Sequence, residues 1–591
     1  MSIRATRFAR AALTALSGFS LCFLGQTAIS TAESSEVQPS DVTWAWQGWN
    51  KKTRDFFHYA SQGTYLTQSD WFVALEQPNS EALISDPAHL ASFGFMIEPK
   101  SPANPLGLPV GFSVGRNPGT NMISTEKTVG LTCSLCHSGQ ITYRGKTIRY
   151  DGLGAIANVT TFADEFTSAI VETYTDPAKW DRFSHRVLGT GYNQASNQAL
   201  RTAFATQVNS IEWTQNNIDE SVMFPVDPGY GRNDAIASIG NVVFGRGLQE
   251  PSNYHPANAN VSFPFLWNAW KFDWVQYDAS VTQPMQRNVG EALGVGAITN
   301  YLTNGTPTPV ESKFKSSVDI YHLAGIETSL QSLEPPRWPE QLFGKPNKGL
   351  ALEGRTLFNT QCATCHAPTP IVNARNTKTK LAAYIMPLAE INTDPLRTQN
   401  ASEARFDPSK LLGVPNSPRI DLSTGLDLVT EGAKQYFYRQ EHLTPRQQAN
   451  LNGNRAPITD LQTLRYKART LEGAWASAPY LHNGSVRNIY DLLGPVEQRS
   501  TQFWVGLSDY DPVLLGVGLK TNENGFMMDT SQAGNSNTGH EFRNGSGPGV
   551  IGRELTDHEK MAIIEYMKVI TVYPPARQPP KRLDPSIWSN Q

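Results

Sequence analysis

The chain has 591 residues, of which 39% are hydrophobic, and its formal net charge at pH 7 is -3. This length is enough for two or more domains with cores of their own. The balanced charge offers no basic surface of the kind that binds nucleic acid, so we expect no nucleic-acid partner.

The N-terminus has the pattern of an export signal. Three arginines within the first ten residues precede an apolar stretch over residues 11–28 and small residues through Ala32. This pattern predicts a signal peptide over residues 1–32. Cys22 lies inside it, and the residues before Cys22 make a poor lipoprotein cleavage site. Because no other run is apolar enough to span a bilayer, we expect a periplasmic or secreted protein without a membrane span.

Four of the five cysteines lie in two copies of the pattern Cys-x-x-Cys-His. The copies are Cys133, Cys136 and His137, then Cys362, Cys365 and His366. In this pattern each thiol bonds one vinyl group of a haem, and the histidine binds the iron as its proximal ligand. A single copy could be a redox pair, and a zinc site built from both pairs would leave the two histidines unexplained. The doubled motif therefore predicts two covalently bound haem c groups.

The two motifs predict a mainly α fold with two cytochrome c-like haem domains, long irregular loops and few short strands. The proline-rich segment 334–339 predicts a linker near residue 335, which gives domains over residues 33–334 and 335–591. An amphipathic helix leads into Cys362, and Thr556 with Glu559 forms a capping box that begins a C-terminal helix.

Elements of the first half are less regular in sequence. We expect helices over residues 155–174, 181–189 and 311–330, and irregular structure over residues 525–549. The long stretch between the two haem motifs exceeds what a bare haem domain needs. It could line a ligand site or form long structural loops.

Several short segments are similar to one known group of proteins. Residues 466–486 read YKARTLEGAWASAPYLHNGSV, and residues 131–133, 229–235 and 272–277 carry further matching stretches. In these segments the chain resembles the bacterial di-haem cytochrome c peroxidase superfamily, in particular its enlarged branch of rubber oxygenases and fatty-acid (oleate) dioxygenases. In that superfamily one haem performs the chemistry and the other relays electrons. The resemblance therefore implies a catalytic haem on His137, in the domain over residues 33–334, and an electron-transfer haem on His366, in the domain over residues 335–591.

The sixth ligand of the electron-transfer haem is not fixed by the motif. The small peroxidases use a methionine shortly after the segment that contains His482 here, and this chain has no methionine at that distance. The candidates are His540, His482, Met527 and Met528. Because the rubber oxygenases place a histidine near the chain end on this iron, we expect His540, although it could also be an ordinary loop histidine.

The resemblance also implies residues that act beside the catalytic haem. Glu291 matches the acid–base glutamate of the peroxidases, which moves a proton of bound peroxide. Trp274 matches the tryptophan between the haems, and Trp267 would line the distal pocket or an access channel. The competing interpretations are a helix-surface glutamate and two core tryptophans.

The peroxidases hold a calcium ion between their haems. Its counterparts in this chain are Asn233 and the carbonyl groups of Ser477 and Pro479, since hard cations prefer oxygen ligands.

These observations predict an exported di-haem c-type oxidoreductase that uses O2 to dioxygenate a hydrophobic unsaturated substrate at the N-terminal haem. Fatty acids such as oleate, and polyisoprene, are the substrate classes that the resemblance implies. The alternatives are a di-haem cytochrome c peroxidase that uses H2O2, which Glu291 favours, and a fatty-acid hydroperoxide isomerase. A small redox protein would fit as electron donor, and the length argues against a plain electron carrier.

Overall fold

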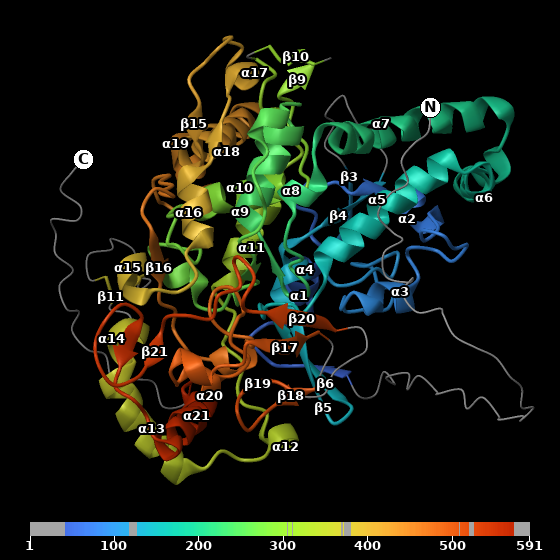
Figure 1. Ribbon diagram of the computed structural model, residues 1–591. Coiled ribbons are helices and arrows are strands. Elements are labelled where there is room, and N and C mark those ends of the chain that lie inside the picture. Colours follow the sequence, from blue (N-terminus) through green and yellow to red (C-terminus); the bar gives the residue numbers. More distant parts are fainter. Residues whose placement is uncertain are drawn as a thin grey trace, which may run out of the picture. The chain divides into compact units, whose positions relative to one another are not determined.

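The computed structural model describes residues 42–116, 127–303, 305–309, 311–367, 370–371, 380–506, 509–518 and 525–571. The predicted signal peptide over residues 1–32 lies outside the described residues. Helices predominate in the described part and the strands are short, which confirms the mainly α prediction (Figure 1). None of the described helices is long and apolar enough to cross a bilayer.

Two small sheets flank the first haem motif. One sheet has the order β1-β6-β5 and the other the order β2-β4-β3. Their strands are β1 (Val42–Trp44), β2 (Thr67–Gln68), β3 (Phe112–Arg116), β4 (Lys127–Leu131), β5 (Ser138–Tyr143) and β6 (Lys146–Asp151). The motif itself forms the short helix α4 (Cys133–His137), which connects β4 to β5 and lies against α1 (Lys51–Tyr59). The two sheets thus hold the motif at both of its ends.

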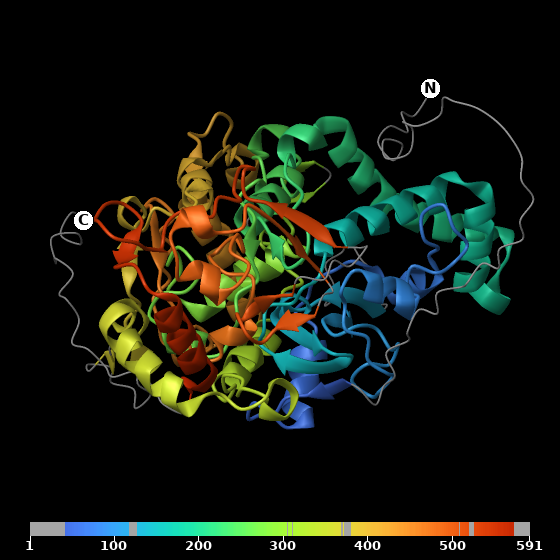
Figure 2. The same ribbon diagram turned by 60° about the horizontal axis from the view of Figure 1, so that its bottom comes forward.

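Three long helices form a group of their own, α5 (Val159–Thr175), α6 (Pro177–Leu188) and α7 (Gln194–Asn217), drawn in teal in Figures 1 and 2. The expected helices over residues 155–174 and 181–189 are confirmed, with shifted starts. The side chain of Asn158 accepts a hydrogen bond from the Thr161 N–H, and Asp176 accepts from the Ala178 N–H, so these residues cap the two helices.

Helix α10 (Pro284–Gly294), which carries Glu291, lies among α9 (Ala235–Gly240), α11 (Ile320–Leu330) and α18 (Leu422–Gln440). The segment η3 (Asn241–Arg246), a π-helix, continues α9. The helix expected over residues 311–330 is wrong in its first part. The side chain of Asp319 accepts a hydrogen bond from the His322 N–H, and this cap begins α11 at Ile320.

The second haem motif lies at the end of a helix that packs closely against the C-terminal helix. Helix α13 (Lys348–Gln361) ends next to α14 (Ala363–His366) and packs along α21 (Asp557–Val569), as Figures 1 and 2 both show. A Cβ on Gly354 would lie 1.8 Å from the carbonyl oxygen of Ala562, so only glycine allows this approach. The rings of Phe358 and Tyr566 pack edge-on at 5.2 Å. The predicted capping box of Thr556 and Glu559 is confirmed at the start of α21.

The remaining elements are short. The helices are α2 (Ser69–Ala74), α3 (Pro87–Ser92), α8 (Glu220–Met223), α12 (Glu340–Phe343), α15 (Leu388–Ile391), α16 (Leu396–Glu403), α17 (Ser409–Leu412), α19 (Pro445–Leu451) and α20 (Ile489–Leu492). The paired strands are β7 (Arg232–Asn233) with β8 (Val261–Ser262), β9 (Leu302–Thr303) with β10 (Thr306–Pro307), β11 (Pro370–Ile371) with β12 (Lys380–Leu381), β13 (Ile385–Pro387) with β16 (Arg465–Lys467), β14 (Arg405–Phe406) with β15 (Ile420–Asp421), β17 (Gln502–Val505) with β20 (Phe526–Asp529), β18 (Tyr510–Asp511) with β19 (Gly516–Val517), and β21 (Glu541–Phe542) with β22 (Val550–Gly552). Strands β20 and β21 lie in the segment 525–549 that was expected to be irregular.

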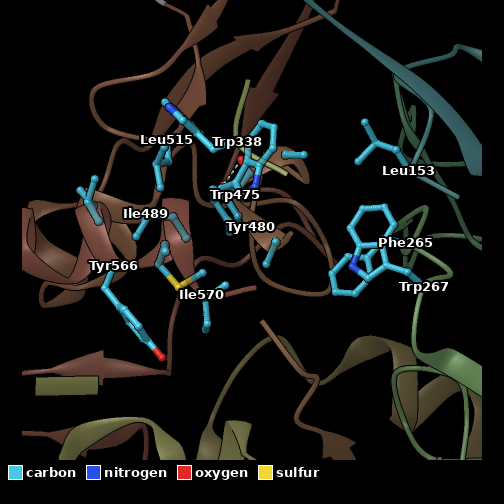
Figure 3. Close-up of a cluster of buried hydrophobic side chains, with 14 of the residues drawn as sticks. Leu153, Phe265, Trp267, Trp338, Trp475, Tyr480, Ile489, Leu515, Tyr566 and Ile570 are labelled. Carbon is cyan, nitrogen blue, oxygen red and sulfur yellow. Dashed lines mark hydrogen bonds between the residues drawn. The ribbon is translucent and has the colours of Figure 1, made fainter. Parts of the chain in front are cut away.

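One aromatic core joins both halves of the chain (Figure 3). Phe265 and Trp267 come from the first half, and Trp475 comes from the second. Trp338, from the predicted linker, is 8% exposed and packs edge-on against Trp475 at 5.1 Å. The described residues between 42 and 571 therefore form one unit, in which two distinct cytochrome c-like domains are not seen. The boundaries near residue 335 stay a prediction.

Candidate functional site

The histidine of the first motif is held by a backbone carbonyl. Its Nδ1 lies 2.8 Å from the carbonyl oxygen of Pro264. Because a carbonyl only accepts, Nδ1 carries the hydrogen, and Nε2 keeps the lone pair that a metal ion requires. Burial lowers the pKa of His137 to about 4, which favours this neutral form.

The histidine of the second motif is held in the same way. The Nδ1 of His366 donates to the carbonyl oxygen of Arg469 at 2.7 Å, and burial lowers the pKa of His366. Both motifs thus present a neutral, oriented imidazole, as metal-binding histidines do.

The thiols of the motifs fit covalent attachment of haem. The four cysteines form no disulfide. Burial raises the pKa of Cys133, Cys136 and Cys362 to about 12. Among the described residues, no group of three or more cysteine, histidine, aspartate or glutamate side chains is placed to hold a metal ion. The two pairs of thiols therefore do not form a zinc site, and together with the oriented histidines they fit covalent attachment of haem c.

The ring of His540 lies next to that of His366. The centres of the two rings are 6.2 Å apart, and the rings are inclined by 65°. Two imidazoles that share one ion, each with a metal–nitrogen bond of about 2 Å, place their ring centres roughly 6 Å apart. Burial lowers the pKa of His540 to about 3, so this ring is also neutral. The geometry at His366 and His540 fits a six-coordinate haem iron.

The other candidates for the sixth ligand have different neighbours. The hydroxyl of Tyr466 donates to the carbonyl oxygen of Asp394 at 2.8 Å and lies 3.0 Å from the Nε2 of His482. The Nε2 of His482 is therefore the donor of that second bond and offers no lone pair. Met528 is fully buried in a cluster with Phe503, and Met527 is its neighbour in β20.

Glu291 lies beside the first motif. Its Oε1 accepts a hydrogen bond from the Nε2 of Gln276 at 2.8 Å, and burial raises the pKa of this carboxyl. After burial, the charge of Glu291 is the next cause that raises the pKa of the Cys133 thiol. The carboxyl group is thus within electrostatic reach of the haem attachment site. One turn earlier on α10, Arg287 forms an ion pair with Glu327.

The predicted tryptophans occupy different places. The ring of Trp267 is fully buried and stacks on Phe265 at 4.5 Å, as Figure 3 shows, and its Nε1 donates to the Glu472 carbonyl oxygen at 2.7 Å. Phe265 directly follows Pro264, the anchor of His137. These contacts bring Trp267, through Phe265, close to the first motif. The ring of Trp274 instead lies 5.0 Å from the Cζ of Arg465.

The expected calcium ligands lie by a small pocket between distant segments. Ser477 and Pro479 line it together with Arg232, which adjoins Asn233. No carboxylate lines this pocket, and Arg232, which is 2% exposed, adds a positive charge. The residues present do not fit a divalent cation, and no step below uses one.

The carbonyl anchors Pro264 and Arg469 were not predicted from the sequence, and neither was Gln276. A carbonyl acceptor is present in every residue, so it leaves no pattern in the sequence. Arg469 lies inside the segment 466–486 that carried the family resemblance, and this was the one signal that could have pointed to it.

The chain is similar to known proteins in sequence. The family described as RoxA-like, cytochrome c-like matches residues 465–505. A protein of Sinorhizobium fredii, titled uncharacterized protein y4iJ, is 36% identical over 574 residues, which cover 90% of this chain and 93% of y4iJ. The chain belongs to the y4iJ family. A second protein of that organism, titled uncharacterized protein y4iM, is 27% identical to it over 290 residues, which cover 47% of the chain and 56% of y4iM.

The RoxA-like match indicates the cofactor and the general class of this member of the y4iJ family. A cytochrome c-like segment implies covalently bound haem c, and the RoxA-like type indicates a haem-dependent oxidoreductase of the rubber oxygenase kind. The matched residues include Arg469, which anchors His366, and His482.

Proposed function

We propose that the chain is an exported di-haem oxidoreductase that uses O2 to dioxygenate a hydrophobic unsaturated substrate at the haem held by Cys133, Cys136 and His137. Fatty acids such as oleate, and polyisoprene, are the proposed substrates. A difference between the two motifs carries the proposal. His366 faces a second imidazole, whereas no ring contact within the described part joins His137 to another histidine. An iron with two protein ligands, a closed site, suits electron transfer, whereas an iron with a free sixth position, an open site, suits catalysis.

A haem at the open site supplies the binding and activation of O2 or peroxide. The chain's own residues orient the group and keep its surroundings dry. His137 is fixed by Pro264, and the stacked rings of Phe265 and Trp267 provide apolar surface next to that anchor. Such surface suits a hydrocarbon substrate and excludes water. Glu291 provides a carboxyl that can hold or release a proton.

The second candidate function is a peroxidase that uses H2O2. Glu291 favours it, because a partly buried carboxyl with a raised pKa, within electrostatic reach of the attachment site, suits proton transfer to and from peroxide. A fatty-acid hydroperoxide isomerase would use the same carboxyl on an organic peroxide. In either function the second haem, which we propose is ligated by His366 and His540, would relay electrons, and a small redox protein could supply them.

The functions are separated by incubating the purified protein, as isolated and after reduction, with oleate, polyisoprene or H2O2 in separate reactions. We expect O2 uptake that depends on oleate or polyisoprene, together with products whose mass is increased by two oxygen atoms or that are cleaved at a double bond. Turnover of H2O2 without any O2 uptake on an unsaturated substrate would contradict the proposal. Conversion of added fatty-acid hydroperoxide without O2 uptake would favour the isomerase.

Export is tested separately by following tagged protein in cell fractions. We expect it in the periplasm or the medium, shortened at its N-terminus by about the length of a signal peptide. Unshortened protein in the cytoplasm would contradict export.

Ligation of the second iron by His540 predicts a spectroscopic change. In His540→Ala, the haem on His366 should convert from low spin to high spin, because one of its two imidazoles is lost. Electron paramagnetic resonance of the oxidised protein measures this. His482→Ala is the matched control and should keep the low-spin signal, since His482 bonds to Tyr466. An unchanged signal in His540→Ala would move the role to another residue.

A further inference from the structure

Three basic residues alternate along β16 and the residues that follow it. Arg465 and Lys467 lie in the strand, and Arg469 follows two residues later. Strand pairing continues past β16, because the Ala468 N–H donates to the Tyr384 carbonyl oxygen at 2.9 Å. Side chains two residues apart in an extended chain share one face, so the three cations form a row.

Each cation of this row lies over an aromatic ring of the segment 265–274. The Cζ of Arg469 is 3.6 Å from the ring centre of Phe265, and the Nζ of Lys467 is 4.8 Å from that of Phe272. The Cζ of Arg465 is 5.0 Å from that of Trp274. The rings stabilise the cations without neutralising their charge.

The three cations differ in their charged partners. Arg465 forms an ion pair with Asp460 at 3.0 Å. Lys467 donates only to the Trp274 carbonyl oxygen, at 3.2 Å, and Arg469 donates to the Phe265 carbonyl oxygen. Among the described residues, neither Lys467 nor Arg469 forms an ion pair with a carboxylate. Burial lowers the pKa of Lys467 to about 7; the charges of Arg469 and Arg287 lower it further, and those of Asp273 and Asp278 raise it.

The two uncompensated cations lie between the haem motifs. The carbonyl group of Arg469 holds His366, and the Arg469 guanidinium donates to the carbonyl of Phe265, the residue after the Pro264 carbonyl that holds His137. Lys467 is in turn within electrostatic reach of Arg469 and Arg287. An anion bound here would therefore lie next to both haem attachment sites.

We propose that Lys467 and Arg469 form a binding site for a carboxylate. A guanidinium offers a planar fork that matches a carboxylate, and two half-buried cations are stabilised by an anion that replaces their lost water. Haem propionates and the head group of a fatty acid share this chemistry. The rings of Phe265 and Phe272 beneath the two cations offer apolar surface to the methylene groups that both ligands carry next to the carboxylate.

The site depends on haem attachment at the two motifs and needs no particular reaction. The carboxylate site can therefore be disproved while the proposed oxygenation is confirmed, or confirmed while the oxygenation is disproved. The readouts are the midpoint potential of each haem and the resonance Raman modes of the propionates, both recorded on ligand-free protein. The ratio of the dissociation constants of oleate and methyl oleate is a third readout.

The variants are Lys467→Gln and Arg469→Gln, with Lys467→Arg as the charge-conserving partner. Loss of a positive charge beside a carboxylate makes reduction harder, so the potential of at least one haem should fall in both Gln variants and recover in Lys467→Arg. Arg465→Gln removes the same charge from the same face but outside the proposed site, and should leave the propionate modes and the oleate preference unchanged. Arg469→Lys and Arg469→Gln form a second pair if Lys467→Gln does not accumulate with both haems.

The outcomes distinguish the source of the carboxylate. Altered potentials and propionate modes in ligand-free protein identify a haem propionate as the ligand. Unaltered spectra together with a lost preference for oleate over methyl oleate identify a free fatty acid. If potentials, propionate modes and the oleate preference all match those of the unchanged protein in folded variants, the proposal is overturned.

Discussion

Replacing both Cys133 and Cys136 by alanine is expected to remove one of two haems and, with it, all substrate turnover. The two thiols are the attachment points beside His137, and the second site, which we propose is closed by His540, would offer no open position to replace it. Haem content from pyridine haemochrome spectra, with the mass of the denatured chain, should show one haem where the unchanged protein has two.

The matched control is the double alanine variant of Cys362 and Cys365. It should also keep one haem but lose the low-spin signal that we assign to His366 and His540. Acid–acetone treatment of the unchanged protein should release no haem, because both groups are covalent. Release of either haem from the intact chain would contradict double attachment.

Glu291→Gln is expected to lower peroxide turnover by a factor of about 10²–10⁴, the usual contribution of a positioned acid or base. Glutamine keeps the size of the side chain and can still hydrogen bond to Gln276, but it cannot take up a proton. Because burial raises the pKa of Glu291, the group becomes a base only above the usual range of a carboxyl. Peroxide turnover of the unchanged protein should therefore fall as the pH falls through that raised pKa. A plot of turnover against pH should lack this decrease in the variant.

Substrate-dependent O2 uptake should survive in Glu291→Gln, since O2 brings no proton that must be moved at the start. The surface residue Glu353 provides the control, and Glu353→Gln should change neither activity. If peroxide turnover and O2 uptake both persist unchanged in Glu291→Gln, Glu291 has no part in the chemistry.

The sequence predicted best those features that depend on neighbouring residues. The capping box at Thr556 could be recognised because the cap and its partner Glu559 lie three residues apart. The start of α11 was predicted too early, although Asp319 is a local cap, because residues 311–319 contain neither glycine nor proline to mark a break. Burial of Trp338 could not be predicted, since its partner Trp475 is distant in sequence.

The site follows the same rule. The cysteines and histidines of the two motifs are recognisable because their chemistry requires a fixed spacing. His540 was chosen by resemblance, and only the fold shows its ring opposite that of His366. The carbonyl anchors of the two histidines and the carbonyl partners of Lys467 and Arg469 depend on segments brought together by folding, which no local pattern records.

The close contact of α13 with α21 at Gly354 has a consequence for the order of events during synthesis. The helix before the second haem motif is completed only by a helix that is made much later, so this part of the core cannot close while the chain is still growing. Cys362 and Cys365 therefore stay accessible to haem after all the strands next to the first motif have been synthesised. Haem can be attached to the second motif late, and the arrival of α21 then seals the packing behind it.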